Sequence, residues 1–117
     1  MPVITELEFD INERAEITDK ITVDGTKRGA AIDISNWSLK AVIHAVGAAI
    51  TDPPLLVYTT AANQITIPVG SDGVLVFTIP LADVQSIGVG DFQYYISRVD
   101  PGSEANLTKG PFTIKYT

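Results

Sequence analysis

Apolar and polar residues alternate along most of this chain. Such alternation is typical of β-strands that turn one face toward a core, because successive side chains of a strand point to opposite faces. The inward positions are Leu7, Phe9 and Ile11; Ile17, Ile21 and Val23; Ile65, Ile67 and Val69; Leu75, Phe77 and Ile79; Phe92, Tyr94 and Ile96; and Phe112, Ile114 and Tyr116. The pattern predicts an all-β protein of about seven to nine strands, built as a sandwich or a barrel.

The stretch GDFQYYISRV, residues 90–99, holds two adjacent tyrosines with different expected surroundings. The alternation puts Tyr94 on the inward face with Phe92 and Ile96, whereas Tyr95 points outward with its polar neighbours. We therefore expect Tyr94 in the core and Tyr95 on the surface.

Two segments depart from a simple strand pattern. Between Leu39 and Ile50 apolar residues recur at helical spacing, while from Trp37 to Ile43 they also recur at strand spacing, so periodicity alone supports both structures equally. In residues 80–88 apolar residues occur at steps of three between a proline and a glycine. This second pattern predicts one short helical turn near 80–87 that links two strands.

Length and composition narrow the class of protein. A chain of 117 residues is expected to form a single domain, residues 1–117, and its 45% hydrophobic and 19% charged content is that of a folded protein. The sequence lacks cysteine, which removes disulfides and thiolate ligands. A net charge of −6 argues against a nucleic-acid partner, which selects basic surfaces. The first residues lack a signal-peptide pattern, so we expect a soluble protein with no membrane segment.

The residues that usually carry catalysis are scarce. The single histidine, His44, shares a strand face with Lys40 and Val42, away from the expected core, and we expect it to be exposed or at an edge. Turn positions hold several aspartates, which are expected to bond to backbone groups there: Asp72, Asp83, Asp91 and Asp100. We expect no catalytic residues, no metal site and no cofactor, and thus a protein that is not an enzyme.

Aromatic residues leave one binding hypothesis open. Trp37, Tyr58, Tyr94 and Tyr95 could form a platform on which sugar rings stack. The strand register instead favours a core position for Trp37 and Tyr94. A carbohydrate-binding or receptor-binding module, which would use Tyr95, Tyr58 or Trp37, remains the alternative, and it requires at least two exposed, coplanar aromatic rings in a groove.

The order of turns and core residues resembles the small immunoglobulin-like β-sandwich proteins of tailed phages and prophages, above all the N-terminal modules of baseplate and tail proteins. In that family pattern, a turn that usually contains glycine follows an aspartate and precedes an inward strand. This chain has IDISNW at 32–37, with Asn36 where glycine is usual. A glycine-led strand, a one-turn helix, a Gly-aromatic-x-Tyr strand and a final strand follow at 73–79, 80–87, 90–94 and 107–116.

The resemblance implies an immunoglobulin-like antiparallel sandwich and favours a strand for residues 39–46. It also implies a structural or assembly protein of the virion, of tail or baseplate type, made in the bacterial cytoplasm and bound to other tail subunits. We expect a homo-oligomer, in which apolar contacts offset the repulsion between copies of charge −6. The candidate contact residues are Tyr95, Val42, Val74, Val76 and Tyr58.

Overall fold

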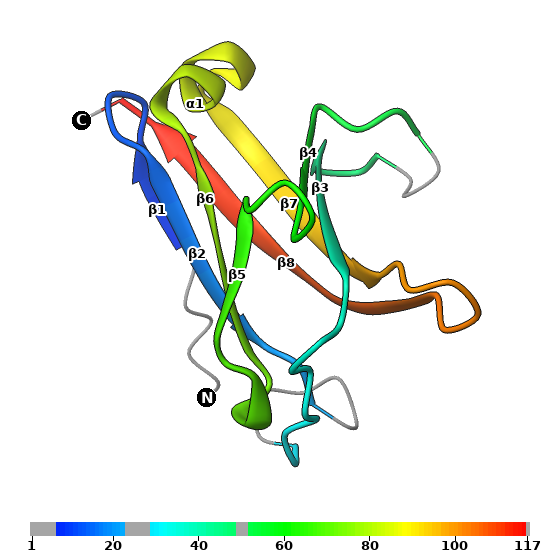
Figure 1. Ribbon diagram of the computed structural model, residues 1–117. Helices are drawn as coiled ribbons and strands as arrows, with labels where there is room; N and C mark the ends of the chain where they lie inside the picture. The colour runs from blue at the N-terminus through cyan, green and yellow to red at the C-terminus, as the bar shows by residue number, and fades with distance from the viewer. Residues whose placement is uncertain (1–6, 23–28, 49–51, 117) are drawn as a thin grey trace.

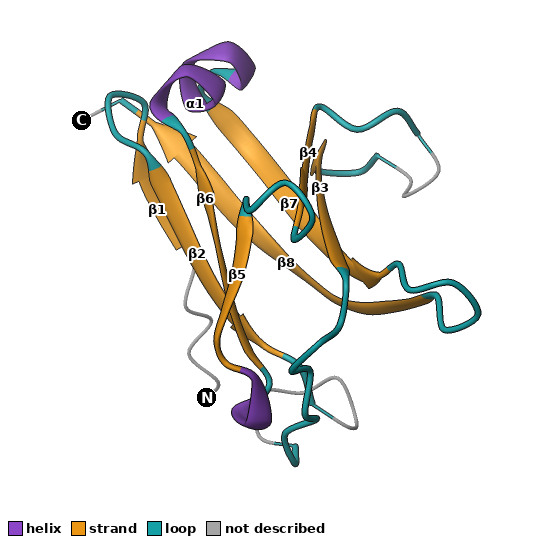
Figure 2. Ribbon diagram, viewed as in Figure 1, coloured by secondary structure: helices purple, strands orange, loops and turns teal. Residues whose placement is uncertain are grey.

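The computed structural model describes residues 7–22, 29–48 and 52–116, and it shows two β-sheets that face each other (Figures 1 and 2). The five-stranded sheet has the order β1-β8-β7-β3-β4, and the three-stranded sheet has the order β2-β6-β5. The strands are β1 (Leu7–Asp10), β2 (Ala15–Lys20), β3 (Leu39–Ala45), β4 (Leu56–Thr59), β5 (Ile65–Val69), β6 (Val74–Ile79), β7 (Gly90–Arg98) and β8 (Ala105–Lys115). The all-β prediction is confirmed.

One strand pair departs from the antiparallel arrangement that we predicted. Strand β1 runs parallel to β8, with Leu7 opposite Phe112 and Asp10 opposite Lys115, whereas every other pair of named strands is antiparallel. The turn after β1 carries the chain from the five-stranded sheet to the three-stranded sheet (Figure 1). Alternation of apolar residues reports which face is buried and not the strand direction, so this pairing left no signal in the sequence.

The core lies between the two sheets and follows the predicted alternation at most positions. Val69 and Tyr116 were predicted to point inward but are 42% and 78% exposed, because the register of β5 shifts before Val69 and Tyr116 follows the end of β8; Val23 lies outside the described residues. Phe77 of β6 packs against Tyr58 and Tyr94 of the opposite sheet, with ring centroids 6.2 and 5.5 Å away. Phe92 stacks on Phe112 at 5.6 Å within the larger sheet. Tyr94 is buried and Tyr95 is partly exposed. The different expectations for the two adjacent tyrosines are therefore confirmed.

Within the ambiguous segment, Leu39–Ala45 form a strand, a turn follows at Val46 and Gly47, and residues 49 and 50 lie outside the described part of the chain. β3 occupies an interior position between β7 and β4, and five of its seven residues are buried. A strand covered on both faces has no polar face, so its apolar residues are nearly continuous. Continuous apolar residues fit helical and strand spacing equally well, which explains why periodicity could not separate the two structures.

The predicted helical turn is also present. Helix α1 (Leu81–Ile87) follows Pro80 and ends at Gly88, whose φ of 78° favours glycine. Its one buried residue, Val84, anchors it to the core. A single turn of 3-10 helix, η1 (Gly70–Asp72), links β5 to β6. None of the helices in the described part of the chain is long and apolar enough to cross a membrane.

Candidate functional site

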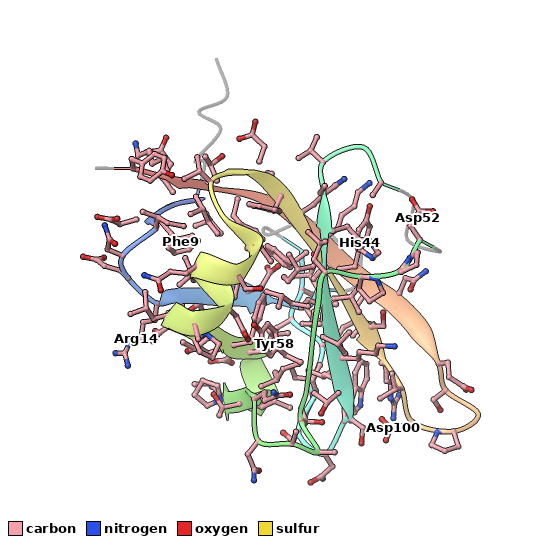
Figure 3. All side chains as sticks on the ribbon, turned by 90° about the horizontal axis from the view of Figure 1, so that it is seen from above. Phe9, Arg14, His44, Asp52, Tyr58 and Asp100 are labelled. Carbon is pink, nitrogen blue, oxygen red and sulfur yellow. The ribbon has the colours of Figure 1, made fainter. Side chains whose placement is uncertain are left out.

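His44 is buried, and the prediction that it is exposed is wrong. Its side chain lies on the outer face of β3, 1% exposed, with the ring edge-on to Tyr95 at 5.5 Å between centroids (Figure 3). Its Nε2 atom has no hydrogen-bond partner among the described residues. Val42, on the same face, is also buried. Strand alternation identified the outer face correctly but could not show that this part of it is covered.

A buried tyrosine–aspartate pair connects the two sheets. Tyr94 Oη on β7 donates a hydrogen bond of 2.6 Å to Oδ2 of Asp19 on β2, and the Lys20 N–H donates to Oδ1 at 2.7 Å. Burial, and then the hydrogen bond to Asp19 and its charge, raise the pKa of Tyr94. Gly110 faces the Tyr94 ring, and a Cβ there would lie 2.6 Å from the Tyr94 hydroxyl, so glycine is required at this position.

Asp19 was not singled out in the sequence, although a signal was present. It lies between Ile17 and Ile21 in the inward register of β2, where a charged residue needs a partner. A polar residue at an inward position of a strand, together with an inward tyrosine elsewhere, is the pattern that would have predicted the pair.

A second pair fixes the helix to the larger sheet. Tyr58 Oη on β4 donates to Oδ2 of Asp83, in the first turn of α1, over 2.7 Å. Burial, with the hydrogen bond to Asp83 next in importance, raises the pKa of Tyr58. Tyr58 is 2% exposed and points into the core below α1 (Figure 3), so the expectation that it lies on a contact surface is wrong.

Trp37 does not offer an open ring face. The Arg98 guanidinium lies 4.0 Å from the centroid of the Trp37 ring, and Arg98 Nε donates to Oδ2 of Asp100 at 2.8 Å. The same oxygen accepts a bond of 2.9 Å from the Ser38 N–H, as we predicted for an aspartate at a turn. These contacts connect the turn after β7 to the start of β3. They also place the Arg98 cation against one face of the Trp37 ring.

Replacing Asp100 with asparagine is expected to lower the stability at neutral pH. The hydrogen bond from Arg98, and then that from the Ser38 N–H, lower the pKa of Asp100 below its ordinary 3.8. A lowered carboxyl pKa stabilises the fold above the unfolded-state value, and this contribution disappears as the pH falls through the folded-state value. Urea unfolding at a series of pH values should show a gap between wild type and Asp100→Asn at pH 7 that closes below 3.8. A gap of constant size would contradict this role.

The five candidate contact residues do not form one surface. Tyr95 and Val42 lie on the outer face of the five-stranded sheet, where Val42 pairs with Tyr95 on one side and Val57 on the other. Val74 and Val76 belong to β6 of the other sheet, where they are partly exposed on its outer face. Tyr58 belongs to the core. Of the five, Tyr95, Val74 and Val76 remain accessible, on two opposite sides of the sandwich.

The surface also lacks the usual features of a ligand site. One shallow groove, about 450 Å³, is lined by polar and aliphatic residues from β3, β7, β8 and the turn between β7 and β8, including Lys40, Arg98 and Glu104, and by no aromatic ring. No three His, Asp or Glu side chains are grouped so that they could hold a metal ion within the described ranges. No family model matches the chain, and a search of curated proteins finds no match.

Proposed function

We propose that this chain is a non-enzymatic structural or assembly protein of a phage or prophage particle, of tail or baseplate type, which acts through contacts with other subunits. The observation that carries the proposal is the backbone at Asn36, where φ is 112°. The phage sandwich pattern usually has glycine at this position, and a φ in this range is one that glycine adopts without strain. The backbone thus meets a specific requirement of the pattern although the residue differs.

The surrounding turn supports the same proposal. The Trp37 N–H bonds to the Ile34 carbonyl over 3.0 Å, which makes Asn36 the third residue of a four-residue turn where positive φ and glycine are favoured. Asp33 Oδ1 accepts a bond of 2.9 Å from the Ser35 N–H at the start of this turn. The two facing sheets, helix α1 and the strand β7 that contains residues 90–94 are compatible with the sandwich strands, the helix and the Gly-aromatic-x-Tyr strand of the pattern.

We expect glycine at position 36 to be tolerated and alanine to destabilise the protein. Asn36→Ala should lower the free energy of unfolding by about 1 kcal/mol, because alanine lacks asparagine's tolerance of positive φ. Asn36→Gly should equal or exceed wild type by up to about 1 kcal/mol, because relief of strain outweighs the added freedom of the unfolded chain. Urea unfolding curves of the three proteins test this, and a glycine variant less stable than the alanine variant would remove the support from the turn.

The carbohydrate-binding alternative receives no support from the aromatic residues. It requires at least two exposed, coplanar rings, yet Arg98 covers Trp37, while Tyr58 and Tyr94 are buried. Tyr95 is the remaining member of the group, and its ring stands edge-on against His44. Within this group, one partly exposed ring does not make a stacking platform, and Tyr116, which is 78% exposed, follows the end of β8 and was not part of the predicted platform, so protein–protein contact is the better-supported activity.

Particle association tests the proposed function directly. Cells that carry the gene with its natural neighbours would be induced for particle production, and the particles would be separated on a density gradient. An antibody raised against the purified chain should detect it in the particle fractions, bound at one place along the particle in immunogold images. Recovery of the chain only in the free-protein fractions, with intact particles present, would contradict the proposal. Binding to a glycan array would instead support the alternative.

A further inference from the structure

Among the described residues, four strands stand at the ends of the two sheets with one unpaired edge each, and three of them carry features that discourage pairing. Free edges expose backbone groups that can pair with another chain, and proteins commonly block them with charges, prolines or bulges. β1 carries Glu8 and Asp10, and β2 carries Glu16, Asp19 and Lys20. β5 contains Pro68 and an irregular register between Thr66 and Val69. β4, Leu56–Thr59, has neither a charge nor a proline.

The chain on either side of β4 carries little charge, and Lys40 of β3 is the charged residue that lies opposite β4 in the sheet register. From Ala41 to Ser71 the sequence contains one charged residue, Asp52. The exposed fractions of Val46, Leu55 and Val57 are 57%, 50% and 41%, and Val57 belongs to β4 itself. In a chain of net charge −6, this is therefore a region where a second, equally acidic copy can approach with little repulsion.

The hydrogen-bond pattern identifies which backbone groups of β4 point to the free edge. The Thr60 N–H bonds to the Leu39 carbonyl, and pairs along an antiparallel ladder alternate between bonded and non-bonded. With Val42 opposite Val57 and Lys40 opposite Thr59, the backbone groups of Val57 and Thr59 point away from β3. Those of Thr59 are already bonded within the chain: its N–H to Gln64 Oε1 at 3.2 Å, and its carbonyl to the Gln64 N–H at 3.0 Å. Val57 is left as the one residue of β4 whose N–H and carbonyl on this edge have no partner within the part of the chain that the structure describes.

We propose that β4 pairs antiparallel with β4 of a second copy of this chain, around a two-fold axis beside Val57. The N–H of each Val57 donates to the carbonyl of the other, which is the self-complementary arrangement that a two-fold contact requires. The Gln64 contacts prevent the pairing from extending through Thr59 and so fix its register. The result is a continuous ten-stranded sheet, with the row Tyr95, Val42 and Val57 continued by its symmetry mate on the outer face.

This pairing adds to the proposed function by naming a second copy of the chain as a partner. It rests on the proposed function only for the statement that the dimer forms within a particle. Its geometry comes from the β4 edge alone. A contact of two backbone hydrogen bonds and a few valine and leucine side chains is small, so the dimer is expected to form at high local concentration, as in an assembling particle.

Val57→Pro is the decisive variant. Proline removes the N–H that the pairing uses, and no other described residue bonds to that N–H, so an edge strand tolerates the change. Sedimentation equilibrium over a concentration series should show a monomer–dimer equilibrium for wild type and a dissociation constant at least about ten-fold higher for Val57→Pro, which corresponds to about 1.4 kcal/mol. Far-ultraviolet circular dichroism and the melting temperature report whether the variant is folded.

If Val57→Pro does not fold, two lysine variants, one on each sheet, test the pairing instead. Val57→Lys should weaken the dimer, whereas Val69→Lys, on the edge strand of the other sheet, should not, although the two valines are 41% and 42% exposed. A wild type that stays monomeric over the series, a Val57→Lys dimer as stable as wild type, or equal weakening by both lysines would overturn the pairing. A monomer that still enters particles contradicts only the pairing, while a dimer that never enters particles contradicts only the proposed function.

Discussion

Replacing Phe77 with alanine is expected to lower the free energy of unfolding by about 3 to 5 kcal/mol, the range for removal of a large buried aromatic side chain. Phe77 is 1% exposed and is the residue of the three-stranded sheet whose ring meets both Tyr58 and Tyr94 of the five-stranded sheet. Its loss leaves a cavity at the point where the sheets touch. The typical free energy of unfolding of a domain is about 5 to 15 kcal/mol, so this single change is expected to remove a large fraction of the total stability.

Val76→Ala provides the matched control for this variant. Val76 is the preceding residue on β6, points to the outer face and is partly exposed, so its truncation should cost about 1 kcal/mol or less. Urea unfolding followed by tryptophan fluorescence measures both changes. If the Val76 variant lost more stability than the Phe77 variant, the register of β6 would be shifted by one residue, because such a shift exchanges the two faces.

Phe77 also illustrates which parts of the fold could be predicted from the sequence. The alternation that placed it inward depends on local chemistry, and it identified the buried faces of β2, β6, β7 and β8. Apolar residues at steps of three between Pro80 and Gly88, which are also a local signal, identified the helix. The strand direction of β1 depends on a pairing with β8 more than 100 residues away, and alternation contains no information about such pairing. Covering of an outer face is equally non-local, so the burial of Val42 and His44 was not predictable from their own strand.

The candidate contact surface was harder to predict for the same reason. A surface is a set of residues from different strands, and the sequence gives the face of each residue without saying which faces are joined. Val42 and Val76 both point outward but belong to different sheets, and Tyr58 was assigned by its apolar neighbourhood and not by a register. The β4 edge became visible only when the register against β3 and the contacts of Gln64 were known.

Tyr94→Phe is expected to cost about 1.5 to 3 kcal/mol at neutral pH, the range for a hydrogen bond to a charged group. The change removes the hydroxyl that donates to Asp19 and keeps the ring that packs against Phe77 and Gly110. Asp19 is 4% exposed, so its carboxylate cannot replace this donor with bulk water without opening the sandwich. Tyr95→Phe, one residue away and facing outward, should change stability by no more than about 0.5 kcal/mol.

The alkaline branch of the stability curve gives Tyr94 a second, independent readout. Its folded-state pKa is raised above the ordinary 10.0, first by burial and then by Asp19. A raised tyrosine pKa leaves the stabilisation intact below pH 10.0 and removes it above, because the unfolded tyrosine ionises there while the folded one stays protonated. The free energy of unfolding, measured from pH 8 to pH 11, should therefore fall less steeply above pH 10 for Tyr94→Phe than for wild type. Some decrease remains in the variant, because Tyr58 also has a raised pKa. Equal slopes would show that the Tyr94 hydroxyl ionises in the folded protein and is not held between the sheets.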